Sequence, residues 1–402
     1  MKKRCVSLLV AVSLVGTMLC GCGGGTAVAG ETADGGAAAS SQEAEAGAED
    51  NILRLGVSAP MTGSYALYGE GAQNAVDMAV EEINSSGGKF QVEIINNGTV
   101  MDDAGDSKQA VNAYNSIMAA DPDAFIATYN SSCSLPMAEL AQKDGMLQLV
   151  SVATNYKITE IGDHIFRACF IDPYQGKMAA QFAGEKGCKK AAVIYAKDDD
   201  YSNGLKDAFV ENAPANGMEV VYSGECTSKD TDFSAQVSQV AASGADYLFF
   251  PCILDIVPLL VQQARAAGFE GIIMGGDAWD GADTTGLEDE FENTFYTNHY
   301  SAEDTSEAVQ SFVKKYTEKY GDDSLTAAAA LYYDCVYMLL DAAKKADATD
   351  TESLVKAMTN MEFSGVTGTF TLNDTGDPEK NVVVNTYVDG KVKWVTTLEP
   401  GK

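Results

Sequence analysis

The sequence predicts an α/β protein with two doubly wound parallel sheets, one in each of two lobes. Short apolar runs alternate with longer amphipathic runs along most of the chain after residue 51, which is the pattern of alternating strands and helices. The apolar runs are continuous, as is typical of parallel strands covered by helices on both faces. The alternation restarts after the segment 167–176 (RACFIDPYQG), so we expect two sheets with a crevice between them.

The first series of elements begins with the run 52–60 (ILRLGVSAP), which predicts a strand. The helix after it is expected to end at SSGG (85–88), because glycine readily adopts the left-handed turn that closes many helices. Further strands are expected at 90–95, 124–128 and 146–152, and further helices at 107–119 and 136–145. The last helix is expected to begin at Pro136, since proline suits the first helical position.

The second series repeats the pattern after residue 176. Strands are expected at 190–196, 218–224, 246–253 and 271–276, and helices at 203–213, 233–242 and 255–267. The chain ends differently, with expected helices at 307–319 and 325–345 and β-like segments at 365–372, 381–390 and 391–398. Periodicity alone does not show on which lobe these last segments pack.

The N-terminus reads as an export signal. Residues 1–21 combine a positive start (MKKRC) with an apolar core too short for a confident membrane span. The end of this segment, LCGC, resembles a bacterial lipobox, which implies cleavage before Cys22 and lipid attachment to its thiol. An ordinary secretory signal is the alternative. Residues 22–50 are mainly Gly, Ala, Ser, Thr and acid and predict a flexible acidic tether of about 30 Å root-mean-square length.

Charge and cysteine spacing exclude several functions. The formal net charge of −31 repels phosphate backbones, so no nucleic-acid partner is expected. The six cysteines beyond the signal show no metal-ligand spacing, and we expect mostly free, buried thiols and no metal or cofactor. They are Cys133, Cys169, Cys188, Cys226, Cys252 and Cys335. The two histidines, His164 and His299, lie in no catalytic motif and are interpreted as structural.

Hydroxyl and acidic residues follow several predicted strands, and little Lys or Arg accompanies them. Because ligands bind beyond the carboxyl ends of the strands in open α/β sheets, these residues are the site candidates. The hydroxyls of Ser131 and Thr154, with N–H groups at helix starts, suit a carboxylate, and Asp277 suits an ammonium. This inventory favours a zwitterion. The alternatives are a helix cap or turn for Ser131 and Asp277 and a turn hydroxyl for Thr154.

Aromatic residues near the same strand ends complete the candidate site. Tyr68, Tyr201 and Trp279 could form walls around an apolar or aromatic side chain and attract an ammonium. A solvated loop tyrosine at Tyr201 and a core position for Trp279 are the alternatives.

Several long motifs resemble one known family. They are LGVSAPMTGSYALYGEGAQNAVDMAVEEINSSGG (55–88), DDAGDSKQAVNAYNSI (102–117), DFSAQVSQVAASGADYLFF (232–250) and QARAAGF (263–269). Their order and spacing resemble the type I periplasmic binding proteins for branched-chain amino acids, which are substrate-binding lipoproteins of ABC importers. The resemblance covers nearly all of 53–398.

The resemblance implies two lobes joined by three hinge crossovers, which close on the ligand. The crossovers are expected near 171–173, 298–302 and 366–372. Lobe 1 would then comprise 51–171 and 302–366, and lobe 2 would comprise 172–301 and 367–402.

The resemblance also assigns site residues. Ser131 and Thr154 match the family's carboxylate-binding residues, and Ala153 matches a backbone contact. Asp277 stands where the family usually has a glutamate for the α-amino group. Tyr201 matches the family's tyrosine of lobe 2, and Tyr68 matches a tyrosine near the mouth of the cleft.

This chain departs from the family at three places, and these leave the ligand's side chain open. Ile253 or Leu254 stands where an aromatic residue is common, and Trp279 and Asp280 replace smaller residues. Gly105 and Asn130 occupy the positions of a frequent family disulfide, which the chain therefore lacks.

The resemblance implies an extracytoplasmic solute-binding lipoprotein, not an enzyme, anchored to the bacterial membrane through Cys22. It would capture a branched-chain or other apolar or aromatic amino acid and deliver it to an ABC permease and its ATPase complex. Two alternatives stay open. One is a surface sensor for a small amide or carboxylate, and the other is a hydrolase that uses Asp198, Asp199 or Asp280.

Overall fold

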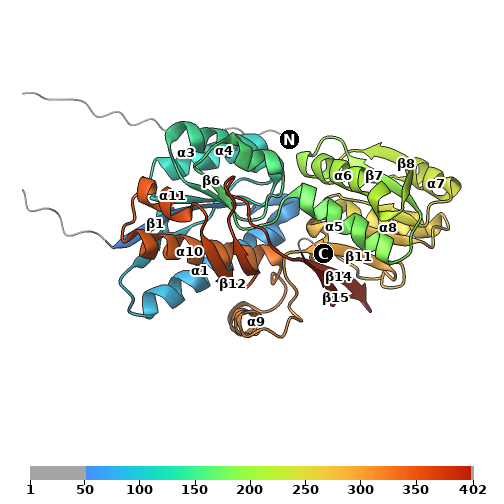
Figure 1. Cartoon of the computed structure of the whole chain (residues 1–402). Coiled ribbons are helices and arrows are strands. Elements are labelled where there is room, and N and C mark those ends of the chain that lie inside the picture. Colours follow the sequence, from blue (N-terminus) through green and yellow to red (C-terminus); the bar gives the residue numbers. More distant parts are fainter. Residues whose placement is uncertain (1–50, 400–402) are drawn as a thin grey trace, which may run out of the picture. The chain divides into compact units, whose positions relative to one another are not determined.

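The computed structural model describes residues 51–399, which form an α/β fold with largely parallel sheets (Figure 1). The predicted fold class is confirmed. The expectations for the signal peptide (1–21), the tether (22–50) and lipidation of Cys22 lie outside the described residues. Within them, no helix is long and apolar enough to cross a membrane.

The first sheet contains six strands, and all of its pairings are parallel. The order is β2-β1-β4-β5-β6, and β3 pairs with the last two residues of β1. Units are thus added on both sides of β1, as in other doubly wound sheets. The strands are β1 (Ile52–Ala59), β2 (Gln91–Ile94), β3 (Met101–Asp102), β4 (Ala124–Ala127), β5 (Gln148–Val150) and β6 (Ile165–Arg167).

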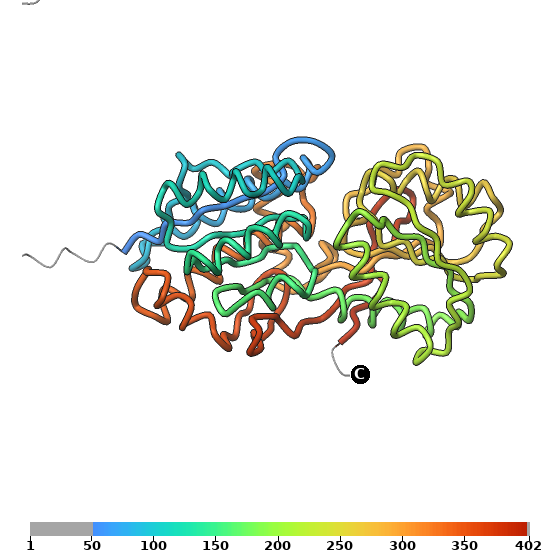
Figure 2. Tube along the Cα trace, turned by 90° about the horizontal axis from the view of Figure 1, so that it is seen from above, coloured from blue at the N-terminus to red at the C-terminus, as the bar shows by residue number. Residues whose placement is uncertain are grey.

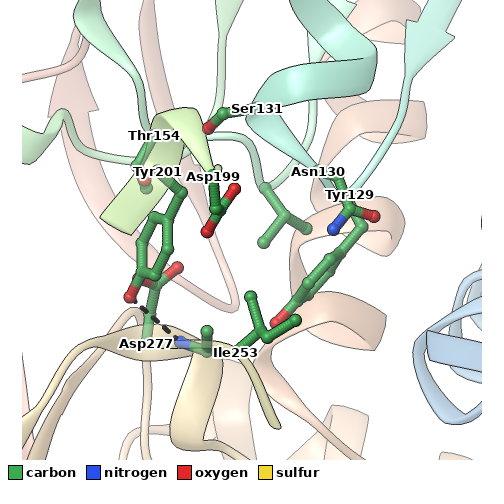
Figure 3. Close-up of a pocket in the computed structure, with 10 residues that line it drawn as sticks. Tyr129, Asn130, Ser131, Thr154, Asp199, Tyr201, Ile253 and Asp277 are labelled. Carbon is green, nitrogen blue, oxygen red and sulfur yellow. Dashed lines mark hydrogen bonds between the residues drawn. The ribbon is translucent and has the colours of Figure 1, made fainter. Parts of the chain in front are cut away.

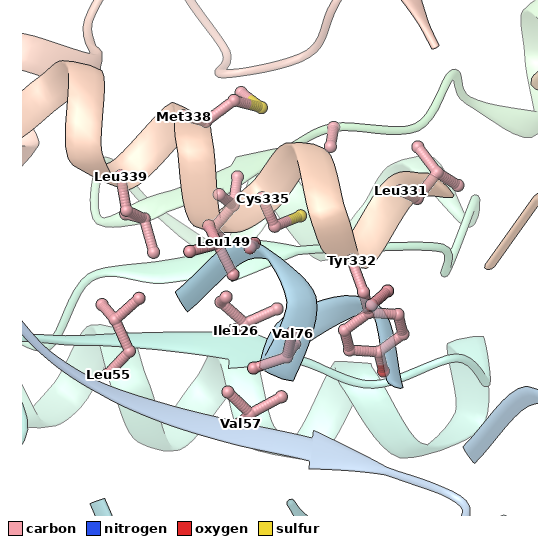
Figure 4. Packing of buried hydrophobic residues seen from close by; sticks show 14 of the residues in the cluster. Leu55, Val57, Val76, Ile126, Leu149, Leu331, Tyr332, Cys335, Met338 and Leu339 are labelled. Atoms are coloured by element: carbon pink, nitrogen blue, oxygen red, sulfur yellow. The ribbon is translucent and has the colours of Figure 1, made fainter. Parts of the chain in front are cut away.

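Helices cover both faces of the first sheet, because successive residues of its strands point to opposite sides. In β4, Ile126 packs in the cluster with helices α1 and α10 (Figure 4), whereas Phe125 packs in the cluster with α3 and α4. Helices α9 and α11 also contribute to the first of these clusters. The helices are α1 (Ala66–Ser85), α2 (Ile95–Gly98), α3 (Ser107–Met118), α4 (Ser131–Asp144), α9 (Glu307–Tyr320), α10 (Ala327–Ala346) and α11 (Thr351–Met358).

The second sheet contains seven strands in the order β15-β14-β11-β10-β9-β7-β8. The five strands from β11 to β8 are parallel, and β14 and β15 extend the sheet as antiparallel strands. The strands are β7 (Lys190–Ala196), β8 (Glu219–Cys226), β9 (Tyr247–Phe249), β10 (Ile272–Gly275), β11 (Thr294–Asn298), β14 (Val382–Val388) and β15 (Lys391–Leu398). The helices are α5 (Asp172–Glu185), α6 (Asp200–Asn212), α7 (Ser234–Ser243) and α8 (Val257–Ala266).

Several elements differ from the sequence prediction. Helix α4 begins at Ser131, so Pro136 lies inside it and the serines belong to its first turn. The predicted strand at 365–372 is a separate hairpin of β12 (Glu362–Gly365) and β13 (Gly368–Thr371). The short strands β6 and β11 were not predicted, because each carries polar residues among its few apolar ones.

The chain passes between the two hydrophobic cores three times (Figure 2). Cys169 packs in the core of the first sheet and Phe170 in that of the second, and the second passage lies between Tyr296 and Tyr300. The third passage requires a correction. Residues 367–372 were assigned to lobe 2, but Phe370 and Leu372 pack in the core of the first sheet. The passage therefore follows Leu372, since the hairpin buries its apolar side there.

Candidate ligand-binding site

A pocket lies where carboxyl ends of strands from both sheets face each other (Figure 3). It holds about 300 Å³ of empty space, including some that is open to solvent. The lining residues are Tyr129, Asn130, Ser131, Val152, Thr154, Asp199, Tyr201, Ile253, Asp277 and Ala278. The structure thus brings four predicted residues, Ser131, Thr154, Tyr201 and Asp277, into one pocket.

The side of the pocket that the first sheet contributes offers hydrogen-bond donors. Ser131 is the first residue of α4, and its N–H group and that of Ser132 have no acceptor within the helix. The Ser131 hydroxyl does not cap this helix, because its oxygen accepts a bond from the Asn155 N–H at 3.3 Å. Thr154 is 1 % exposed, and its hydroxyl lies beside the buried carboxyl group of Asp172 and forms a side-chain hydrogen bond with it. The N–H groups at the start of α4 are donors that can bind an anionic guest.

The side that the second sheet contributes offers a buried carboxylate. Asp277 is 7 % exposed and follows β10, at the start of the short 3-10 helix η5 (Asp277–Trp279). Gln175 Nε2 at 2.7 Å and the Tyr201 hydroxyl at 3.0 Å donate to its Oδ1, and Nε2 of His299 lies 3.1 Å from its Oδ2. The lining residues include no Lys or Arg. The carboxylate can therefore hold a cationic group of a ligand.

Tyr201 is held against Asp277 from helix α6. Its hydroxyl also accepts a bond from the Ala278 N–H at 3.4 Å, which Figure 3 draws as a dashed line. A Cβ at Gly276 would lie 2.1 Å from the Tyr201 hydroxyl oxygen, so only glycine allows this approach. Burial raises the pKa of Tyr201 well above its usual value, and its hydroxyl therefore stays a donor.

A second acid, Asp199, lines the pocket at the start of α6. It caps this helix by accepting the Ser202 N–H at 3.3 Å, and the hydroxyl of Ser132 donates to it at 3.4 Å. Burial raises its pKa to about 6. Asn155 Nδ2 donates to the Asp200 carbonyl at 3.0 Å close by. The first turn of α4 and the loop after β5 therefore contact the first turn of α6 across the pocket.

Three predicted residues do not line the pocket. Tyr68 lies behind it, stacked on Tyr129 with ring centroids 4.1 Å apart. The carbonyl of Ala153 accepts a bond from Nη1 of Arg167 at 3.0 Å. Trp279 differs most from the expectation of an aromatic wall. Its side chain is fully buried in the core of the second sheet, where its indole N–H donates to the Phe250 carbonyl at 3.0 Å.

Sequence reasoning missed residues that hold the site from behind. His299 and Gln175 contact Asp277, yet neither stands in a motif, and His299 follows a strand that was not predicted. Asp280 is buried and connects β11 of the second sheet to helix α10. It accepts hydrogen bonds from the Tyr296 hydroxyl at 3.0 Å and from the Ala327 N–H at 2.6 Å. Burial raises the pKa of Asp280.

The cysteines and Asp198, one acid of the hydrolase alternative, do not line the pocket. The six cysteines within residues 51–399 are free and buried. Within the same residues, no group of three or more His, Cys, Asp or Glu side chains could hold a metal ion. Asp198 is exposed and accepts the N–H of Ser228 at 2.8 Å.

Comparisons with known proteins agree with this geometry. A family model described as periplasmic binding protein matches residues 52–391. The Leu/Ile/Val-binding protein homolog 3 of Brucella melitensis is 27% identical over 346 residues, which cover 85% of this chain and 92% of that protein. A leucine binding protein of Thermotoga maritima has a TM-score of 0.79 and 29% identity, covering 87% of this chain and 99% of the other. A branched-chain amino acid transporter substrate binding protein of Streptococcus pneumoniae, solved with isoleucine, has a TM-score of 0.79 and 25% identity, with 87% and 100% covered.

Proposed function

The chain belongs to the periplasmic binding protein family, and from this premise we propose that it captures a branched-chain or other apolar or aromatic amino acid for an ABC importer. The observation that carries the proposal is the division of polar groups across the pocket. Figure 3 shows Ser131 and Thr154 on one side and Asp277 on the other. Such a division suits a zwitterion, whose two charges would each find a partner from a different sheet.

The carboxylate of the ligand would dock first on the donor side. The free N–H groups at the start of α4 and the hydroxyls of Ser131 and Thr154 support this assignment. The ammonium would then bind Asp277, which Tyr201 holds in place. Only a closed form would satisfy both charges, so the ligand would shift the hinge equilibrium towards closure.

The hinge would consist of the three passages between the two cores. Lobe 1 would comprise residues 51–169 and 300–372, and lobe 2 the rest of the described chain. The contact of Ser132 with Asp199 is long, at 3.4 Å, and would form and break as the cleft closes and opens.

The remaining lining residues suggest the class of ligand side chain. Val152, Ile253, Ala278 and the ring of Tyr129 are apolar surfaces between the two polar sides. They suit an aliphatic or small aromatic side chain. Without Trp279 in the wall, an aliphatic side chain would be favoured.

Anchoring and delivery follow from the sequence and the family. The protein would be exported, cleaved before Cys22 and held to the membrane by lipid on that thiol. Residues 22–50 would let the closed, loaded form reach a permease, whose ATPase partner supplies the energy for import.

A thermal-shift screen of the purified protein tests the proposal. The twenty amino acids would be compared with benzoate and with small amides. For each amino acid that raises the melting temperature, the corresponding amine without a carboxylate and the N-acetyl derivative would also be tested. We expect stabilisation by aliphatic amino acids and none by derivatives that lack either charge. Stabilisation by a carboxylate or amide without an ammonium would contradict the proposal and favour a sensor of such compounds.

A further inference from the structure

We infer that His299 is a positioning residue for the amino-acid site and that its protonation competes with the ligand for Asp277. This inference rests on the proposed function, because it assigns the ligand's ammonium group to Asp277. It adds a proton-linked step to ligand binding that involves a residue outside the pocket lining.

The position of His299 is fixed on two sides. It follows β11 in the second passage between the cores and is 2 % exposed. Its ring stacks on Phe170 of the first passage, with centroids 3.8 Å apart and an interplanar angle of 27°. Its Nε2 lies 3.1 Å from Asp277 Oδ2. The imidazole therefore connects two hinge segments to the acid that would bind the ligand.

The hydrogen bonds indicate which form of His299 supports binding. Gln175 and Tyr201 both donate to Asp277 Oδ1, whereas His299 approaches Oδ2. The buried Nδ1 has no hydrogen-bond partner among the described residues. A neutral ring with its proton on Nε2 donates to Oδ2 and requires no acceptor at Nδ1. This form holds the carboxylate in place and leaves its negative charge for the ligand.

The charged groups around the ring decide when it becomes protonated. Burial lowers the pKa of His299, the contact with Asp277 opposes this, and the nearby Lys380 adds to the lowering. Asp172 at the start of α5 is a further buried acid near Asp277, and burial raises its pKa well above its usual value. The Tyr201 hydroxyl is neutral for the same reason. Burial therefore favours the neutral ring of His299, which takes up a proton only as the solution becomes more acidic.

Protonation changes the balance of charge at Asp277. A charged imidazolium would form an ion pair with the carboxylate, and a bound ammonium would place a second positive charge beside it. Two cations would then share one buried anion, which is unfavourable at short range. Ligand binding must therefore release a proton from His299 at low pH. The dissociation constant should rise as the pH falls, towards about tenfold per pH unit at the limit of one proton.

The experiment measures the dissociation constant of L-leucine by isothermal titration calorimetry at several pH values from 7.5 to 5. His299→Gln keeps an N–H donor for Asp277 and cannot titrate. His164→Gln is the matched control, because this histidine lies outside the pocket and pairs only with the exposed Asp163. Asp199→Asn tests the other acid that titrates near pH 6.

We expect the wild type and His164→Gln to bind less tightly as the pH falls. His299→Gln should lose most of this dependence, whatever its affinity at pH 7.5. A dependence that persists in His299→Gln, or that disappears only in Asp199→Asn, would overturn the inference. Failure of every amino acid to bind at pH 7.5 would instead reject the proposed function.

A measurement on the wild type alone covers the case in which His299→Gln does not fold. Titrations at pH 5.5 in two buffers with different ionisation enthalpies report the protons exchanged on binding. The inference requires a net release of protons, since the α-groups of leucine keep their charges in this range. Zero release or proton uptake would refute it.

Discussion

Replacing Asp277 by asparagine removes one negative charge from the pocket and keeps the size of the side chain. The asparagine oxygen can still accept the bonds that Gln175 and Tyr201 donate to Oδ1. Its amide would face His299 Nε2, which can become an acceptor by changing tautomer. This tautomer places an N–H at the buried Nδ1 of His299, which has no acceptor among the described residues, so the free energy of unfolding of the ligand-free protein should fall by about 1–3 kcal/mol. Asp277→Ala is a poorer test, because it would leave three buried groups unpaired at about 1–3 kcal/mol each.

The effect of Asp277→Asn on binding should be large. Breaking a buried ion pair by removing one partner costs about 3–5 kcal/mol. At about 1.4 kcal/mol for each factor of ten, the affinity for an amino acid should fall by two to four orders of magnitude. Isothermal titration calorimetry at pH 7.5 measures this loss. Asp207→Asn is the matched control, since it makes the same substitution at an exposed acid of α6.

A loss of less than tenfold in Asp277→Asn would refute the assignment of the ammonium to Asp277. The same conclusion would follow if Asp207→Asn lost as much affinity as Asp277→Asn. In either case the ligand's positive charge must be neutralised elsewhere, and Asp199 would be the next acid to test.

Three further substitutions test other parts of the structure. Thr154→Val removes a hydroxyl that the proposal assigns to the carboxylate of the ligand, so calorimetry should show about 10- to 100-fold weaker binding, from about 1.5–3 kcal/mol for a bond to a charged group; unchanged binding would contradict this. In Asp280→Asn only one side-chain oxygen remains to accept from the Tyr296 hydroxyl and the Ala327 N–H, so one donor is left unpaired. The free energy of unfolding measured in urea should fall by about 1–3 kcal/mol. Burial lowers the pKa of Lys380 to about 8, and in the unfolded chain it stays near about 10.4. Because the unfolded chain then binds more protons, the free energy of unfolding should rise by roughly 1–2 kcal/mol between about pH 8 and 9.5, and Lys380→Met should remove this rise.

The sequence predicted most of the fold because parallel strands that are buried on both faces consist of continuous apolar runs. The run 124–127 is apolar throughout, since Phe125 and Ile126 pack against different helices. The strands that were missed are short and carry polar residues, as in β11 (TFYTN). Their position depends on pairing with β10 and β14, which is a long-range property that no local window contains.

The candidate site was predictable as far as the positions of the strand ends determine which residues meet. Ser131, Thr154 and Asp277 were found because residues at the carboxyl ends of parallel strands meet at one edge. The direction of Trp279 was not predictable, because it lies in a short 3-10 helix whose orientation depends on tertiary packing. The contact of His299 with Asp277 was equally unpredictable from the sequence. It depends on the approach of two chain segments that are far apart in the sequence.

The six free thiols within residues 51–399 have a consequence for the proposed export of this chain. In the folded state they are buried, so oxidants and metal ions outside the cytoplasm have little access to them. During translocation the same thiols would be exposed, and any random cross-link would trap the chain before it is complete. Maturation would therefore be most efficient if the chain folds faster than its thiols are oxidised. The folded domain would need neither a thiol oxidase nor a disulfide isomerase to reach its native state.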